Sequence, residues 1–296
     1  MDNAVLTTYS SPMDDRCLDE NQLEFWKTNG FLVLEGVFVA DEVNSLQREA
    51  DFILELIINS SLSLERQSRR LDIRKRRNGG MIVRKIQPII DLSLELAKIS
   101  ADDRLLKPMA ELIGETPVLM EEKLNYKQPI SEIDFFRVPE DDDCFPIHND
   151  WAYYRYNDYP DTIISSAITL DACHAENGSI KVFPASHHAH VDHLRVRNGL
   201  EVPAGSVDID SAETLTVSAG SIIFFHSKLI HTSEPNQTDL PRRIMIYSHY
   251  PESADMGIDI RNGPNRLRES PWEWEYQRRK ATGEVKDTFS VNGGSQ

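Results

Sequence analysis

Short β-rich segments, separated by turn-rich stretches, fill the second half of the chain and limit the folds that it can adopt. Glu176-Asn177-Gly178 and Ser218-Ala219-Gly220 are typical of these turns. Strands this short and this closely spaced indicate a sandwich or barrel rather than alternating βαβ units. We therefore expect a double-stranded β-helix, or jelly roll, over about residues 115–250. The expected strands cover residues 118–127, 163–170, 179–183, 221–225 and 243–250.

The first half of the chain combines helices with two strands, so the predicted fold class is α+β. Gly30 is expected to end a first helix in the left-handed conformation, and Asp41 is expected to cap a second helix. A third helix is expected over residues 101–113, and the two strands are expected at 31–34 and 81–86. The helices would then support the jelly-roll core from its N-terminal side.

The 296 residues suit one large domain, and the sequence contains no repeat and no composition shift typical of a linker. We expect a single jelly-roll domain over residues 19–275. A loose N-terminal tail is expected over residues 1–18, and a disordered C-terminal tail over residues 276–296.

Charge and cysteine content exclude several classes of protein. The chain has 48 acidic and 32 basic residues, a net charge of −16, which argues against binding to nucleic acid or an anionic membrane. No apolar run approaches the roughly 20 residues that a membrane span needs, and no secretory signal is visible. Three widely separated cysteines, in no CxxC pattern, argue against a disulfide framework. We therefore expect a cytoplasmic protein with a small-molecule partner, and the oligomeric state stays open.

A candidate metal site combines two distant parts of the sequence. His148-Asn149-Asp150 places a histidine and a carboxylate two residues apart, and His231 follows the expected strand 221–225. Two histidines and one carboxylate form the facial triad of non-haem Fe(II) oxygenases. The 83 residues between the histidines are compatible with a jelly roll, where distant strands face each other across its mouth. A second triplet, His190-Val191-Asp192, lies in a turn-like stretch and is interpreted as a surface loop.

An aromatic run and an arginine pair accompany these candidate ligands. Trp151, Tyr153 and Tyr154 follow the triplet and would either line a substrate pocket or pack in the core. Arg242 and Arg243 follow the turn-rich loop after His231, and an antiparallel hairpin would place one of them beside that histidine. An arginine there could hold a carboxylate with two hydrogen bonds. Two exposed arginines on an edge strand explain the pair equally well.

Several motifs in order resemble the phytanoyl-CoA dioxygenase-like family of Fe(II)/2-oxoglutarate oxygenases. The resemblance runs from Phe25 to about Tyr250, which is most of the chain. The motifs that carry it are Asn29-Gly30-Phe31-Leu32-Val33-Leu34-Glu35-Gly36-Val37-Phe38, His148-Asn149-Asp150, Glu176-Asn177-Gly178-Ser179-Ile180-Lys181-Val182-Phe183-Pro184-Ala185-Ser186-His187, His231-Thr232-Ser233-Glu234-Pro235-Asn236 and Arg242.

The resemblance implies that the protein uses Fe(II), 2-oxoglutarate and O₂. Three residues match the iron ligands of the family, namely His148, Asp150 and His231. The family usually has glutamine between the first two, where this chain has Asn149. Halogenating relatives lack the carboxylate ligand, so Asp150 argues for oxygen insertion.

The resemblance also assigns residues to the co-substrate. Arg242, eleven residues after the distal histidine, matches the arginine that pairs with the distal carboxylate of 2-oxoglutarate. Ser233 matches a hydroxyl group that assists it. Lys85 matches more loosely a lysine that reaches the co-substrate in some members.

The implied activity is hydroxylation of an unactivated carbon in a small-molecule metabolite, with release of succinate and CO₂. Natural-product biosynthesis and acyl-thioester metabolism are the two settings that we expect. Desaturation or ring chemistry on the same fold stays open, as does a catalytically silent, cupin-like binding module. The complete set of three ligands plus Arg242 argues against the silent module.

A histidine cluster and a basic segment each have more than one possible interpretation. His187, His188, His190 and His193 could form a zinc site, but no cysteine or glutamate is suitably spaced nearby, and the resemblance places His187 in a structural turn. The basic segment 65–77 could be a solvated helix face, a nucleic-acid patch or part of a mobile lid.

The lid would extend over residues 62–80 and end at Gly79-Gly80. Its Arg74, Arg76 and Arg77 would favour an anionic, partly hydrophobic metabolite, such as a natural-product acid or an acyl thioester.

Overall fold

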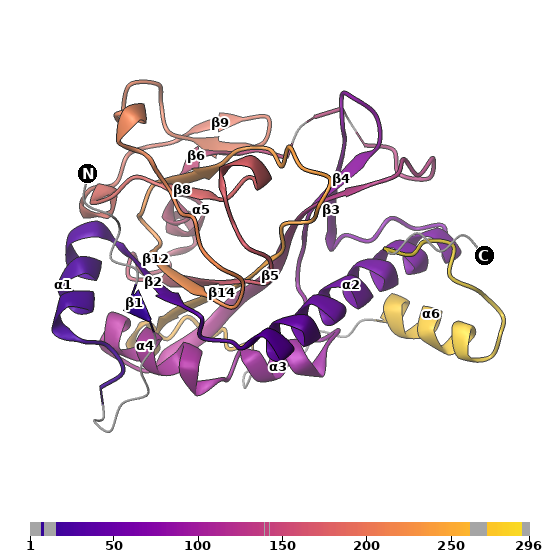
Figure 1. Cartoon of the computed structure of the whole chain (residues 1–296), viewed down its shortest axis with the longest axis horizontal. Coiled ribbons are helices and arrows are strands. Elements are labelled where there is room, and N and C mark those ends of the chain that lie inside the picture. The colour runs from indigo at the N-terminus through magenta and orange to yellow at the C-terminus, as the bar shows by residue number, and fades with distance from the viewer. Residues whose placement is uncertain (1–6, 9–15, 139, 142, 261–270, 292–296) are drawn as a thin grey trace.

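The computed structural model describes residues 7–8, 16–138, 140–141, 143–260 and 271–291. Two β-sheets lie face to face, and the long helices cover the outer face of the larger sheet (Figure 1). All strand pairs except one short parallel pair at the sheet edge are antiparallel within the described residues. The predicted α+β jelly roll with supporting N-terminal helices is therefore confirmed.

The larger sheet has eight strands, and its spatial order differs from the order in the chain. From one edge to the other they are β1 (Thr7–Thr8), β2 (Phe31–Glu35), β12 (Ile222–His226), β7 (Ile164–Thr169), β14 (Ile244–Pro251), β5 (Pro117–Ile130), β4 (Met81–Ile86) and β3 (Leu71–Lys75).

The smaller sheet has four strands, and a separate hairpin lies beside it. The four strands, in spatial order, are β11 (Glu213–Thr214), β8 (Ile180–Val182), β13 (His231–Ser233) and β6 (Phe145–His148). The hairpin consists of β9 (Leu194–Val196) and β10 (Gly199–Glu201).

Six α-helices complete the described part of the chain. They are α1 (Glu20–Asn29), α2 (Ala40–Ser63), α3 (Leu94–Ile99), α4 (Asp103–Ile113), α5 (Trp151–Tyr154) and α6 (Pro271–Ala281). Gly30 ends α1 with a φ of 79°, as predicted. Asp41 lies in the first turn of α2 rather than at its cap, which is Val39. No helix among the described residues is long and apolar enough to cross a membrane.

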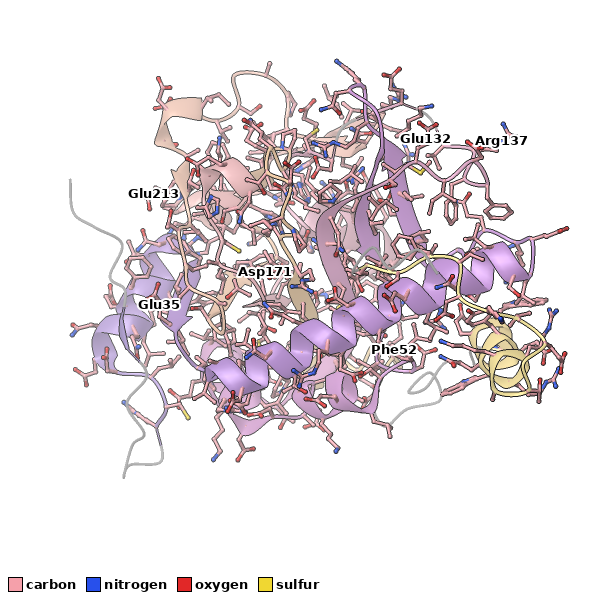
Figure 2. The ribbon with its side chains drawn as sticks, turned by 45° about the vertical axis from the view of Figure 1, so that its right-hand side comes forward. Glu35, Phe52, Glu132, Arg137, Asp171 and Glu213 are labelled. Carbon is pink, nitrogen blue, oxygen red and sulfur yellow. The ribbon has the colours of Figure 1, made fainter. Side chains whose placement is uncertain are left out.

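Alternating side chains divide the core into two layers. Ile223 and Phe225 of β12 pack between the sheets against Val182 of β8, whereas Ile222 and Phe224 face the helices. Figure 2 shows α2 lying across the large sheet. This arrangement leaves the space between the two sheets for the functional site.

The basic segment is neither a helix nor a free loop. Residues 71–75 form β3 at the edge of the large sheet, paired with β4 from Leu71 to Lys75. Arg74 pairs with Asp72 of the same strand. Sequence periodicity missed this strand because its alternating charged side chains resemble a solvated helix face.

Residues 276–291, which were expected to form a disordered tail, pack against the rest of the protein. Tyr276 of α6 is only 1% exposed, and Asn59 of α2 accepts hydrogen bonds from the backbone of Thr288 and Phe289 at 2.8 and 2.9 Å. The expected disordered tail is therefore wrong for residues 276–291, which pack on α2. Residues 292–296 and most of the predicted N-terminal tail lie outside the described residues.

Arg243 connects three elements at the start of β14. Its Nε and Nη2 donate to Asp171, just after β7, each at 2.9 Å. Its Nη1 donates to Asp51 of α2 at 2.7 Å. The guanidinium is 8% exposed, so these charge pairs are largely removed from water. Arg243 thus ties the large sheet to the helix that covers it, and Figure 2 shows Asp171 beside α2.

We expect Arg243→Ala to lower the free energy of unfolding by about 3 kcal/mol, because two carboxylates lose their partly buried cation. Chemical denaturation followed by circular dichroism measures this change. Arg48→Ala, on the exposed face of α2, is the matched control and should change stability by less than about 0.5 kcal/mol. Equal losses in the two variants would contradict the structural role of Arg243.

Candidate metal centre and co-substrate pocket

The pairing of β6 with β13 places the two candidate histidine ligands side by side. His231 is the partner of His148 in this antiparallel ladder, and their ring centroids are 4.5 Å apart. Asp150 follows in the turn that leads into α5. Its Oδ1 lies 3.5 Å from Nε2 of His148 and 3.8 Å from Nε2 of His231. The three predicted ligands therefore come together, with one donor atom from each within 4.8 Å of the others.

Hydrogen bonds fix the orientation of both imidazole rings. Nδ1 of His148 lies 2.7 Å from the carbonyl oxygen of Pro146, and Nδ1 of His231 lies 3.0 Å from that of Leu229. A carbonyl only accepts, so each Nδ1 carries the proton and donates. Each Nε2 then keeps its lone pair directed at Asp150, which is the arrangement that metal-binding histidines need.

The protonation states also suit metal binding. Burial and the neighbouring His148 lower the pKa of His231 to about 4. Burial alone would raise the pKa of Asp150, but the neighbouring His148, His231 and Lys123 hold it below its usual range. At neutral pH the site therefore presents an unprotonated Nε2 on His231 and a carboxylate on Asp150, the forms that bind a cation.

A buried asparagine holds the loop between the first two ligands. Asn149 is 0% exposed, and its backbone N–H donates to Nε2 of His193 at 3.0 Å. Nδ1 of His193 is 2.7 Å from the carbonyl of Val191, which fixes the tautomer that accepts. The side-chain oxygen of Asn149 accepts from the N–H of Ala152 at 3.0 Å. The substitution of asparagine for the usual glutamine is thus accommodated by a complete set of contacts.

The other histidines of the predicted cluster have structural partners. Nε2 of His187 lies 3.2 Å from the carbonyl of Lys27, and Nε2 of His188 lies 3.3 Å from that of Thr28, both at the end of α1. Among the described residues, the metal-binding geometry is found only at His148, Asp150 and His231. The zinc interpretation is therefore not supported in the described part of the chain.

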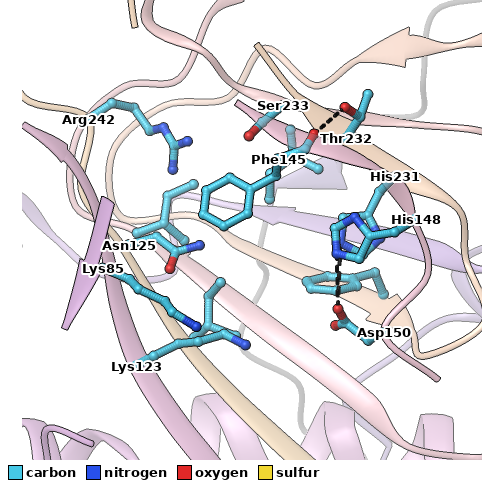
Figure 3. A pocket seen from close by; sticks show the side chains of 14 residues that line it. Lys85, Lys123, Asn125, Phe145, His148, Asp150, His231, Thr232, Ser233 and Arg242 are labelled. Carbon is cyan, nitrogen blue, oxygen red and sulfur yellow. Dashed lines mark hydrogen bonds and ion pairs between the residues drawn. The ribbon is translucent and has the colours of Figure 1, made fainter. Parts of the chain in front are cut away.

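A cavity opens beside the candidate metal ligands between the two sheets. Arg242 and Ser233 lie at one end, while Lys85, Lys123 and Asn125 form the wall contributed by β4 and β5 (Figure 3). The Phe145 ring stands between these two groups.

Arg242 is the most isolated charge in this cavity. Its side chain is 1% exposed, and Nη2 donates to the carbonyl of Gly178 at 2.8 Å. Its Nε has no hydrogen-bond partner, and Arg242 forms no ion pair with any described residue. A fully buried guanidinium with a free donor needs an anion from outside the chain. A carboxylate of a bound ligand would satisfy that requirement.

The path by which Arg242 reaches the site differs from the predicted hairpin. β13 pairs with β6 and β8 in the small sheet, whereas β14 belongs to the large sheet. Arg242 precedes β14 and therefore enters the cavity from the opposite sheet. The hairpin prediction was wrong because consecutive strands of a jelly roll alternate between its sheets. The expectation that Arg242 and Arg243 face different environments agrees with their separate contacts.

The predicted aromatic run separates into two environments. The ring of Tyr153 lies 5.8 Å from that of His148, and its hydroxyl accepts from the N–H of Leu200 in the β9–β10 hairpin at 2.8 Å. Trp151 packs against His190, with ring centroids 4.8 Å apart. Tyr154 is 9% exposed and belongs to a core cluster. None of the three predicted aromatic residues is among the described residues lining the cavity, and the short helix α5 turns Trp151 and Tyr154 away from it.

Lys123, Asn125 and Phe145 are among the lining residues that the sequence interpretation missed. Lys123 and Asn125 alternate on β5 with side chains buried on the helix side, so they face the cavity. This alternation was visible in the sequence within the predicted strand 118–127. Phe145 offered no comparable signal, since β6 is only four residues long.

The comparison with known proteins agrees with this geometry. A family model described as phytanoyl-CoA dioxygenase (PhyH) matches residues 26–244, which is most of the chain. The chain belongs to this family. It is therefore a non-haem Fe(II)/2-oxoglutarate-dependent dioxygenase, and the residues brought together in its cavity are of the type that this chemistry requires.

Individual relatives are distant. The chain is 25% identical to the ectoine dioxygenase of Sphingopyxis alaskensis, over 79% of this chain and 76% of that protein. It is 26% identical to the probable alpha-ketoglutarate-dependent hypophosphite dioxygenase of Stutzerimonas stutzeri, over half of each chain. The structure of EctD from S. alaskensis with 2-oxoglutarate and 5-hydroxyectoine has a TM-score of 0.57 at 22% identity, covering 86% of this chain and 82% of that one. This similarity confirms the fold.

The donor set and the buried cation fit the two groups that the family uses. His148, Asp150 and His231 would hold the iron, and Arg242 offers its free donor to the co-substrate. When bound together, iron and 2-oxoglutarate supply the activation of O₂ for oxidation of the substrate. The chain itself contributes the orientation of the two histidine ligands and a buried positive charge that would face a carboxylate of the co-substrate.

We expect His193→Leu to weaken metal binding by about 10-fold, because the N–H between two ligands loses its acceptor. A competitive titration with a chelating dye measures the dissociation constant. His188→Leu removes an exposed histidine of the same segment and should leave that constant unchanged. Equal affinities in both variants would show that His193 does not position the ligands.

Proposed function

We propose that the protein hydroxylates an unactivated carbon of a small-molecule metabolite, with release of succinate and CO₂. The observation that supports this most strongly is a single cavity that holds both the three iron-ligand residues and Arg242. Natural-product biosynthesis or acyl-thioester metabolism is the proposed setting. The named relatives act on small molecules, such as ectoine and hypophosphite, which is consistent with this proposal.

The residues around the cavity have separate roles in the proposal. Arg242 and Ser233 bind the distal carboxylate of 2-oxoglutarate, and Lys85 adds positive charge on the opposite wall. Tyr153 packs against His148 and holds the β9–β10 hairpin, and so borders the substrate. Trp151 and Tyr154, which pack away from the cavity, would shape the substrate pocket only through α5.

The predicted basic lid receives little support. Arg76 and Arg77 line a different cavity, together with Asp141 and Asp143. Arg74 is neutralised by Asp72. An anionic substrate therefore needs another source of positive charge than the segment 62–80.

A cytoplasmic location is part of the same proposal. Cys17, Cys144 and Cys173 are all free thiols, as a reducing compartment would leave them. The net charge of −16 supports a small-molecule partner rather than a nucleic acid.

We expect anaerobic addition of Fe(II) and 2-oxoglutarate to give a weak visible charge-transfer band, because the co-substrate would bind to iron held by the triad. Asp150→Ala and His231→Ala should abolish the band, and absorption spectroscopy measures it. Absence of the band in the wild-type protein would favour the silent binding module. A band that is unchanged in both variants would show that the metal binds elsewhere.

Arg242→Ala should weaken 2-oxoglutarate binding by about 3 kcal/mol, because the distal carboxylate loses its charged hydrogen-bonding partner. Titration of the visible band with 2-oxoglutarate gives the affinity. Arg243→Ala is the neighbouring control and should change it little, since Arg243 contacts Asp171 and Asp51 instead. The two variants are compared at a temperature at which both are folded. The reverse ranking would contradict the proposed co-substrate site.

A further inference from the structure

A second group of charges lies in the cavity on the wall opposite Arg242. Lys123 of β5 donates from Nζ to Oε1 of Glu121 at 2.5 Å. Glu121 also accepts from the hydroxyl of Tyr154 at 3.4 Å. Lys85 of β4 has only Gln87 as a hydrogen-bond partner among the described residues, at 3.4 Å. Lys123 therefore has a carboxylate partner, whereas Glu121 and Asp72 attract Lys85 only at longer range.

Both lysines are directed into the open part of the cavity. Lys123 lines the cavity while its neighbours on β5, Glu122 and Leu124, are buried on the other face of the sheet. Its side chain keeps 17% exposure. Figure 3 shows the amino groups of Lys85 and Lys123 near each other, with Asn125 and Phe145 between them and Arg242. The site proposed for the distal carboxylate is therefore distinct from Lys123.

A count of the charges in the cavity shows an excess of positive charge on the wall formed by Lys85 and Lys123. With the proposed groups bound, the two charges of Fe(II) are balanced by Asp150 and the carboxylate of 2-oxoglutarate at the metal. Arg242 is balanced by the distal carboxylate, and Lys123 by Glu121. The charge of Lys85 is offset only at longer range by Asp72, and a partly desolvated cavity favours an added anion on this wall.

The pKa shifts of the two lysines are consistent with this lack of negative charge. Burial lowers the pKa of Lys123, but Glu121 and Asp150 raise it by more, so this side chain stays a cation at neutral pH. Burial and the charge of Lys123 lower the pKa of Lys85. An anion on this wall would relieve the repulsion between the two ammonium groups.

We propose that Lys123 binds an oxyanion on the substrate, so that the substrates are small organic acids carrying a carboxylate or a phosphonate. This inference rests on the proposed function, because it requires 2-oxoglutarate to occupy Arg242. Lys123 keeps donors beyond the one it gives to Glu121, since an ammonium group has three. Glu121 acts as a positioning residue that holds Lys123 toward the cavity.

The test uses probe molecules rather than the unknown substrate. Propanoate, propylphosphonate and the neutral propanamide are titrated into the protein loaded with Zn(II) and saturating 2-oxoglutarate. Ligand-observed NMR gives each dissociation constant without turnover. We expect saturable binding of at least one acid and binding of the amide that is at least 10-fold weaker. The stronger acid identifies the preferred oxyanion.

The variants remove the lysine without leaving a buried charge alone. Lys123→Met by itself would strand the Glu121 carboxylate, so the main variant is Lys123→Met with Glu121→Gln, which keeps the net charge. We expect it to weaken binding of the acid at least 10-fold. Lys123→Arg should retain most of the affinity. Lys75→Met, at an exposed lysine of β3, is the control and should bind as the wild type does.

The outcomes separate this inference from the proposed function. It is overturned if the wild-type protein binds neither acid, if the amide binds equally well, or if the double variant keeps wild-type affinity. In each case an intact Fe(II)–2-oxoglutarate band would leave the proposed function standing. Loss of that band in the wild-type protein would overturn both.

Discussion

The antiparallel pairing of β6 with β13 is the constraint on which the active site depends. It sets His148 opposite His231, so one strand register decides whether the two ligands meet. β13 also pairs with β8 on its other side, where His231 is opposite Val182. Because a slip of one residue would turn His231 to the other face, the double pairing protects the metal site. The backbone carbonyls of Pro146 and Leu229 then set the rotation of each ring.

The second organising feature is positive charge that the chain does not neutralise by itself. Arg242 is fully buried without an ion pair among the described residues, and Lys85 contacts Gln87 rather than a carboxylate. Such groups are costly in a protein without their ligands. They are consistent with the proposed binding of 2-oxoglutarate and of an acidic substrate in this cavity. Arg243, one residue away, shows the contrast, because Asp51 and Asp171 satisfy it and it serves stability.

The sequence was sufficient for the parts of the fold that have a clear periodicity or a distinctive motif. The strands near residues 81–86 and 164–169 and the three metal ligands were predicted from such patterns. It was insufficient where contacts depend on topology. Arg242 was expected in a hairpin with His231, but it arrives from the other sheet.

Short or atypical segments explain the remaining differences. β3 was missed because its charged residues hide the alternation, and the packing of residues 276–291 on α2 depends on Asn59, more than 200 positions away. Lys123 could have been found, since it alternates with buried residues on a predicted strand. His193 could not, because nothing in the sequence indicates that it accepts the N–H of Asn149.

The central claim is that this cavity couples O₂ to the breakdown of 2-oxoglutarate. Incubation with Fe(II), 2-oxoglutarate and ¹⁸O₂, followed by mass spectrometry of the succinate formed, tests it most directly. The reaction consumes 2-oxoglutarate and O₂ and gives succinate and CO₂, with one oxygen atom of O₂ in the new carboxylate. We predict succinate carrying one ¹⁸O atom from the wild-type protein and none from Asp150→Ala. Unlabelled succinate, or equal yields from the two proteins, would contradict the account.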